Sequence, residues 1–127
     1  MASCLVVDDS AVVCGIAADI LRAFGHDVTE ARTAEAAITR CKDGVDVVLL
    51  DWDLPSLGAL DFLREAALLA EERRPAIILC ASENDPRQFS LARAAGAAYH
   101  VLKPFDRDDL AEVMRKAGFD APKRSVA

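Results

Sequence analysis

Short apolar runs alternate with longer stretches of helical periodicity along the chain, and this alternation restricts the fold more than any other feature. Short runs rich in Val, Ile and Leu predict strands over residues 3–8, 26–31, 45–51, 76–81 and 97–102. Apolar residues at helical spacing predict helices over residues 10–24, 33–42, 57–73, 86–95 and 106–117. Such alternation is typical of a parallel sheet covered by helices on both faces.

The run at residues 45–51, VDVVLLD, predicts the centre of that sheet. Its unbroken apolar segment indicates burial on both faces, as in a central parallel strand. Right-handed crossovers with a reversal near the first strand then give an α/β, doubly wound sheet. In such sheets ligands bind beyond the carboxyl ends of the strands, where the strand order reverses.

Length, charge and termini narrow the class of protein. The 127 residues fit one domain, which we expect to cover residues 1–117, with a short C-terminal tail at residues 118–127. A net charge of −6 argues against nucleic acid as a partner and against an anionic membrane surface. The sequence shows no signal peptide and no apolar run near the roughly 18 residues that a membrane span needs, so we expect a cytoplasmic protein without membrane insertion.

Charged residues follow the first, third and fifth predicted strands. Asp8 and Asp9 end the first, Asp51 ends the third with Asp53 just beyond it, and Lys103 follows the fifth. Parallel strands bring these ends to one edge of the sheet, where several carboxylates would repel one another strongly. A hard divalent cation relieves this repulsion, and carboxylate oxygens are habitual ligands of Mg²⁺. A lysine there can pair with whichever anion occupies the site.

Three motifs in this order resemble the receiver domain of bacterial response regulators. They are Asp8-Asp9, the Asp51 that closes an apolar strand with Pro55 four residues later, and the KPF sequence at residues 103–105. The resemblance covers about residues 3–117. The DWDLP at residues 51–55 resembles single-domain chemotaxis regulators, and the CASEND at residues 80–85 their alphaproteobacterial branch. The resemblance to the receiver domain implies a flavodoxin-like fold with strand order 2-1-3-4-5.

The resemblance also implies a role for each charged residue. Asp51 would be the phosphoacceptor for a sensor histidine kinase, a phosphotransfer protein or a small phosphodonor. Asp9 and Asp51 would bind Mg²⁺ directly, together with the backbone carbonyl of Asp53, and Asp8 would act largely through water. Lys103 would contact the phosphoryl group. The protein would then be no enzyme beyond its own phosphorylation and dephosphorylation.

The residues expected to sense phosphorylation depart from the family pattern. The Ser or Thr that usually ends the fourth strand is Ala81 here, and Ser82 follows it. Neighbouring strand residues face opposite sides, so Ser82 is not expected simply to replace the missing hydroxyl, although the backbone can deviate at a strand end. The family's switch aromatic falls on His100, which could make the output depend on pH or could be only a half-exposed strand residue.

Three functions are compatible with these observations. The first is a stand-alone response regulator whose output is a protein–protein contact through the face of the fourth helix and fifth strand, with an unknown downstream partner. The second is a degenerate receiver that binds its partner without phosphorylation because Ala81 has uncoupled the switch. The third, more remote, is a haloacid-dehalogenase-like phosphatase, since Asp51-Trp52-Asp53 resembles the nucleophile motif of those enzymes. They usually carry Thr or Val where Pro55 stands, and Asp8-Asp9 has no place in their scheme.

Overall fold

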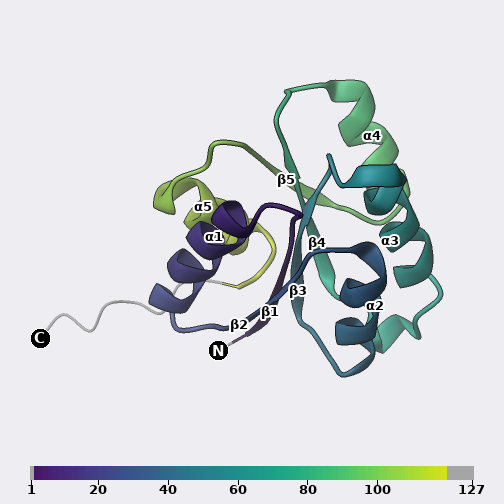
Figure 1. Cartoon of the computed structure of the whole chain (residues 1–127), viewed down its shortest axis with the longest axis horizontal. Helices are drawn as coiled ribbons and strands as arrows, with labels where there is room; N and C mark the ends of the chain where they lie inside the picture. Colours follow the sequence, from purple (N-terminus) through teal and green to yellow (C-terminus); the bar gives the residue numbers. More distant parts are fainter. Residues whose placement is uncertain (1, 120–127) are drawn as a thin grey trace, which may run out of the picture.

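The structure is a computed structural model that describes residues 2–119, and it contains a five-stranded parallel sheet (Figure 1). The strand order is β2-β1-β3-β4-β5, which confirms the predicted doubly wound α/β fold. The strands are β1 (Ser3–Val7), β2 (Asp27–Ala31), β3 (Val47–Asp51), β4 (Ala76–Ala81) and β5 (Tyr99–Leu102).

Five helices cover the two faces of the sheet. Helices α1 and α5 lie on one face, and α2, α3 and α4 lie on the other (Figure 1). Four of them begin at a Ser, Thr or Asp whose side chain accepts a backbone N–H of the first turn, which satisfies one of the free donors at the helix start. The helices are α1 (Ala11–Ala23), α2 (Ala34–Lys42), α3 (Gly58–Ala66), α4 (Pro86–Ala94) and α5 (Arg107–Lys116). None of the helices within residues 2–119 has the length and apolar character needed to cross a bilayer.

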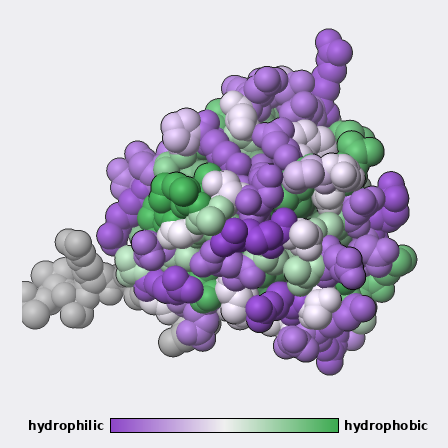
Figure 2. Space-filling view, in the orientation of Figure 1, coloured by the Kyte–Doolittle hydropathy of each residue, from purple (hydrophilic) through white to green (hydrophobic). Residues whose placement is uncertain are grey.

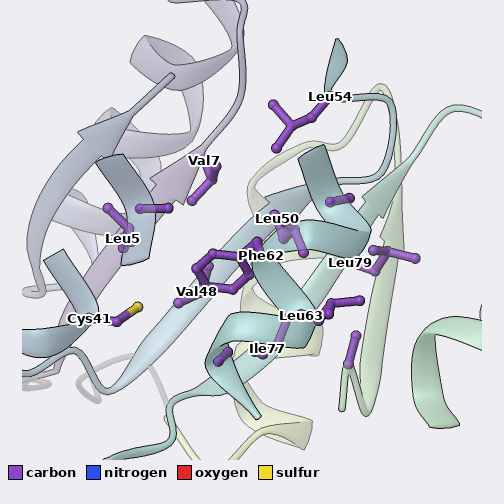
Figure 3. Close-up of a cluster of buried hydrophobic side chains, with 14 of the residues drawn as sticks. Leu5, Val7, Cys41, Val48, Leu50, Leu54, Phe62, Leu63, Ile77 and Leu79 are labelled. Carbon is purple, nitrogen blue, oxygen red and sulfur yellow. The ribbon is translucent and has the colours of Figure 1, made fainter. Parts of the chain in front are cut away.

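Each face of the sheet carries its own hydrophobic core. Phe62 of α3 is fully buried in the core beneath α2, α3 and α4, which also contains Leu50 and Leu79 (Figure 3). The core beneath α1 and α5 takes the alternate strand residues, such as Leu49. Every residue of β3 is buried, as the apolar run predicted for a central strand. The order of the side chains along β3 thus assigns each one to a face.

The predicted helix over residues 57–73 is wrong in its second half. Helix α3 ends at Ala66, and the chain then forms a turn followed by a short 3-10 segment, Glu71–Arg73. The helix also begins later than expected, because a 3-10 turn, Pro55–Leu57, precedes Gly58.

A side chain from beyond the helix explains its early end. The guanidinium group of Arg74 donates hydrogen bonds to the carbonyl oxygens of Ala67 and Leu69, each at 2.9 Å. Carbonyl groups at a helix end need such partners once the helical hydrogen bonds stop. The apolar spacing in the sequence continues past Ala66, and it does not show this contact.

The turn before α3 holds two residues in the left-handed region. Ser56 has φ 57° and Leu57 has φ 58°, although neither is glycine. That conformation costs a residue with a Cβ about 1–2 kcal/mol.

Because Leu57 is 72% exposed, removal of its side chain loses little burial. We expect Leu57→Gly to raise the free energy of unfolding by about 1 kcal/mol in urea denaturation. Leu68→Gly is the matched control, since Leu68 is also exposed but lacks the positive φ, and it should be neutral or destabilising. Equal effects of the two changes would contradict strain at Leu57.

His26 is buried with an incomplete set of hydrogen bonds. Its Nδ1 accepts a hydrogen bond from the backbone N–H of Ala2 at 3.0 Å, while its Nε2 is the one buried side-chain polar atom without a partner in residues 2–119. Burial lowers the pKa of His26. Protonation would place a second N–H where the ring now accepts, so the folded state favours the neutral ring.

The stability of the fold should therefore fall at mildly acidic pH. The folded pKa of His26 lies below the unfolded value of about 6.5, so the unfolded chain binds the proton more readily. The contribution of neutral His26 to the free energy of unfolding is fully present above about pH 6.5. It is lost as the pH falls through the folded pKa. In urea unfolding between pH 7 and pH 5, His26→Gln should flatten the pH dependence. His100→Gln is the comparison: the pKa of His100 is also lowered, so this change should flatten the dependence too, but less, because His100 is exposed. An unchanged slope in His26→Gln would refute the assignment.

The C-terminal end of the described chain packs onto the domain. Helix α5 ends at Lys116, and the backbone N–H of Phe119 donates to the carbonyl of Met114 at 2.8 Å. The rest of the predicted tail, residues 120–127, lies outside the described residues. The domain boundary at residue 117 therefore stays a prediction.

Candidate functional site

The carboxyl ends of β1, β3 and β5 bring one lysine against two aspartates. Lys103 Nζ donates to Asp8 Oδ2 at 2.8 Å and to Asp51 Oδ1 at 2.9 Å. Both carboxylates are almost fully buried, each at 3% exposed. The sequence predicted that these three residues share one edge of the sheet, and the structure brings them into direct contact. They form the centre of the candidate site.

Local structure fixes the position of Asp8. Its Oδ1 accepts the backbone N–H of Ser10 at 2.9 Å, and Ser10 in turn caps α1 by accepting the N–H of Val13. The thiol of Cys14 donates to the carbonyl oxygen of Asp8 at 3.4 Å. The first turn of α1 therefore holds the end of β1, and with it the Asp8 carboxylate, toward the site. The sequence did not indicate this role for Ser10 and Cys14, although they follow Asp8 by two and six residues.

Burial and the lysine act on Asp51 in opposite directions. Burial raises the pKa of Asp51, while the hydrogen bonds from Lys103 and from the backbone N–H of Asp53, the latter at 3.0 Å, act to lower it; the net shift is upward. Burial alone would lower the pKa of Lys103, but its hydrogen bonds to Asp8 and Asp51 outweigh burial and raise it. The lysine is therefore a fixed cation between two carboxylates.

The two oxygens of the Asp51 carboxylate have different surroundings. Both hydrogen bonds from the protein fall on Oδ1, from Lys103 and from the backbone of Asp53. Among the bonds recorded for residues 2–119, none falls on Oδ2. Oδ2 is thus the oxygen left for a ligand or for chemistry.

Three aspartates can hold a metal ion together. One carboxylate oxygen from each of Asp8, Asp9 and Asp51 lies within 4.8 Å of the others, and Asp9 is exposed to solvent. Hard oxygen donors with open positions for water fit Mg²⁺. The side chain of Asp53 is not part of this cluster, and metal binding by its backbone carbonyl stays a prediction.

The predicted switch residues lie in three different environments. Ala81 is buried, and its carbonyl accepts the backbone N–H of Lys103 at 2.8 Å. Ser82 is exposed, and its hydroxyl donates to Asp53 Oδ2 at 3.0 Å. The ring of His100 stacks on Phe89 of α4, with centroids 4.0 Å apart and 15° between the planes. Burial lowers the pKa of His100, and nearby Arg93 and Lys116 lower it further.

A largely apolar cavity opens beside the lysine. It has a volume of about 390 Å³ and lies between the first half of α1 and the segment after β5. Figure 2 shows hydrophobic atoms over α1, where Val12 and Ile16 are 71% and 50% exposed. The residues that line the cavity are Val13, Ile16, Ser82, Lys103, Pro104 and Phe105. The sequence did not indicate this cavity or the contact between His100 and Phe89, because each depends on how separate helices and strands pack.

Comparison with known proteins gives one family over most of the chain. The model of the response regulator receiver domain matches residues 4–115. The chemotaxis protein CheY-3 of Vibrio cholerae is 29% identical over 114 residues, which cover 88% of each chain. The two-component response regulator ORR2 of rice is 29% identical over 92 residues, which cover 72% of this chain but only 36% of the rice protein. The solved structure of the chemotaxis response regulator CheY4 of Vibrio cholerae superimposes with a TM-score of 0.85 at 23% identity, over 92% of this chain and 98% of that one. This last likeness shows the fold.

Proposed function

This chain belongs to the response regulator receiver family, and on that basis we propose that it accepts a phosphoryl group on Asp51 and signals through protein–protein contacts. The observation that carries the proposal is the state of the Asp51 carboxylate. It is buried at the end of β3, Lys103 holds its Oδ1, and its Oδ2 has no donor among residues 2–119. A carboxylate held in this way can act as a nucleophile with one oxygen fixed and one oxygen available.

The proposed transfer is a substitution at phosphorus. Asp51 Oδ2 forms a bond to the phosphorus of a phosphohistidine or of acetyl phosphate, while the bond from phosphorus to the leaving nitrogen or oxygen breaks. The leaving group keeps that electron pair and departs as acetate, or as neutral imidazole when the phosphohistidine ring carries a proton on its other nitrogen. Lys103 offsets negative charge at the site, since such transfer depends mainly on positioning and electrostatics. Hydrolysis returns Asp51 to the unphosphorylated carboxylate. Water attacks phosphorus and the bond from phosphorus to Asp51 breaks. Inorganic phosphate leaves, and the surplus proton passes to solvent.

The acidic cluster supports Mg²⁺ as the cofactor. Asp9 and Asp51 would hold the ion directly, Asp8 lies in the same cluster and would act largely through water, and the backbone carbonyl of Asp53 stays a predicted ligand. When bound, Mg²⁺ supplies positive charge toward the phosphoryl oxygens. Asp8 also keeps Lys103 in place, because it accepts from Nζ at 2.8 Å.

We assign the output to the face of α4 and β5. His100 and Phe89 stack across it, and two leucines are exposed nearby, Leu91 at 53% and Leu102 at 38%. Phosphorylation would shift an existing equilibrium between two arrangements of this face. A histidine kinase or phosphotransfer protein as donor, a stand-alone mode of action and a cytosolic location remain predictions from the sequence.

A degenerate receiver is the second candidate. The buried Ala81 favours it, since no hydroxyl is present at that position. The direct contact of Lys103 with Asp8 and Asp51 argues for a working phosphorylation site instead. The match of the receiver family to residues 4–115 leaves the phosphatase resemblance without support.

Intact-mass spectrometry separates the two candidates. After incubation with acetyl phosphate and Mg²⁺, the protein should gain the mass of one phosphoryl group. Treatment with alkali should remove it, because acyl phosphates are labile. A protein that gains no mass at any donor concentration would refute the proposed function and favour the degenerate receiver.

A further inference from the structure

We propose that Ser82 supplies the phosphoryl-sensing hydroxyl that Ala81 lacks, and that the Asp53 carboxylate holds this hydroxyl until Asp51 is phosphorylated. The inference rests on the proposed function, since it requires a phosphoryl group on Asp51. It concerns the residue that reports phosphorylation to the rest of the domain.

The strand register places Asp51 and Cys80 on the same face of the sheet, and Ser82 lies two residues after Cys80. Asp51 pairs with Cys80, and side chains of paired residues in neighbouring strands point to the same face. Cys80 packs in the core under α1 and α5, whereas Leu79 packs in the opposite core. By alternation Ala81 lies on the side of Leu79, and Ser82 follows directly after β4 has ended. Because Ser82 lies beyond the strand, its contacts, and not the strand register, decide whether its hydroxyl can reach a phosphoryl group on Asp51.

The cavity beside the site gives an independent indication. Ser82 and Lys103 line the same cavity, and Lys103 also donates to Asp51 Oδ1. A phosphoryl group on Asp51 extends beyond the end of β3. Lys103 and Ser82 are the two polar residues that line the cavity, and Lys103 contacts Asp51 directly.

In the unphosphorylated protein, Asp53 connects Ser82 to the nucleophile. The Ser82 hydroxyl donates to Asp53 Oδ2 at 3.0 Å, and the backbone N–H of Asp53 donates to Asp51 Oδ1 at 3.0 Å. The first bond joins the loop after β4 to the loop after β3. The loop that leads into α4 is therefore held by a bond two residues from the site of phosphorylation.

Phosphorylation should exchange the acceptor of the Ser82 hydroxyl. A phosphoryl group carries a charge of about −1.5 to −2 and three strong acceptor oxygens, more than the single negative charge of Asp53. The same charge repels the Asp53 carboxylate, which weakens the existing bond. Ser82 then turns from Asp53 to the phosphoryl group, and the loop before α4 moves with it.

The experiment measures amide chemical shifts of residues 82–102 before and after phosphorylation with acetyl phosphate and Mg²⁺. Intact mass gives the phosphorylated fraction of each sample, and the shifts are compared per phosphorylated molecule. Ser82→Ala should shrink the shifts, because loss of a donor to a charged acceptor lowers the population of the switched state by about tenfold or more. Ser82→Thr keeps the hydroxyl and should restore them. Thr39→Ala, which removes an exposed hydroxyl from α2 and lies outside residues 82–102, is the control and should behave as wild type.

A second variant tests, in the unphosphorylated protein, whether the hydrogen bond to Asp53 keeps the Ser82 hydroxyl in place. Asp53→Ala removes the acceptor of Ser82, so amides of the loop after β4 should move toward their positions in the phosphorylated wild type. The inference is overturned if Ser82→Ala responds as wild type does, or if only Ala81→Thr yields shifts. A wild type that takes up no phosphoryl group overturns the proposed function and this inference together, and the mass measurement identifies that case.

Discussion

The Asp51→Asn variant is expected to gain no phosphoryl group from acetyl phosphate and Mg²⁺, whereas the wild type gains one. Asparagine has nearly the same shape, but its amide oxygen carries no charge and is a poor nucleophile toward phosphorus. The fold should persist, because Lys103 keeps Asp8 as a partner and one of two buried carboxylates disappears. Intact mass measures the incorporation, and thermal unfolding verifies that the variant is folded.

Asp53→Asn is the control for the loss at Asp51. Asp53 lies two residues from Asp51, and its substitution makes the same chemical change. The backbone N–H of residue 53 that donates to Asp51 stays in place. It should still take up one phosphoryl group. Equal incorporation in Asp51→Asn and wild type would refute Asp51 as the acceptor, as would a phosphoryl group found on Ser10, Ser82 or His100.

The second large effect concerns the metal. Trp52, the only tryptophan of the chain, directly follows Asp51 and is partly buried, so Mg²⁺ binding should change its fluorescence in a saturable titration. Asp9→Ala should abolish the signal over the range that saturates the wild type. Removing a group that merely supports a metal ligand costs about 10–100-fold in affinity, and removing a ligand should cost at least as much.

A matched variant separates coordination from long-range charge. Asp43→Ala removes one exposed carboxylate at the end of α2 and changes the net charge equally, but Asp43 is not in the acidic cluster. Its titration should resemble that of the wild type. If Asp9→Ala titrates in the same way as Asp43→Ala, Asp9 is not a ligand.

Much of the fold could be predicted because local sequence periodicity and burial coincide. The apolar run in β3 predicted a strand buried on both faces, and all of its residues are buried. The prediction failed over residues 57–73, where the apolar spacing continues but the helix ends at Ala66. There two hydrogen bonds from Arg74 to carbonyl groups of the turn compete with continuation of the helix. The periodicity of apolar residues does not reveal such contacts.

The sequence by itself determined which charged residues meet, and the tertiary structure decided what each of them holds. Parallel strands end at one edge, so the order of strands alone gathers Asp8, Asp51 and Lys103. The choice of partner depends on atoms brought together from far along the chain: Lys103 and Asp8 are 95 positions apart, and Ser82 and Asp53 are 29 apart. A hydrogen bond needs its atoms within a few tenths of an ångström, and only the packed strands and loops fix side chains that closely. For that reason the site could be located from the sequence, while the bond between Ser82 and Asp53 could be found only in the folded chain.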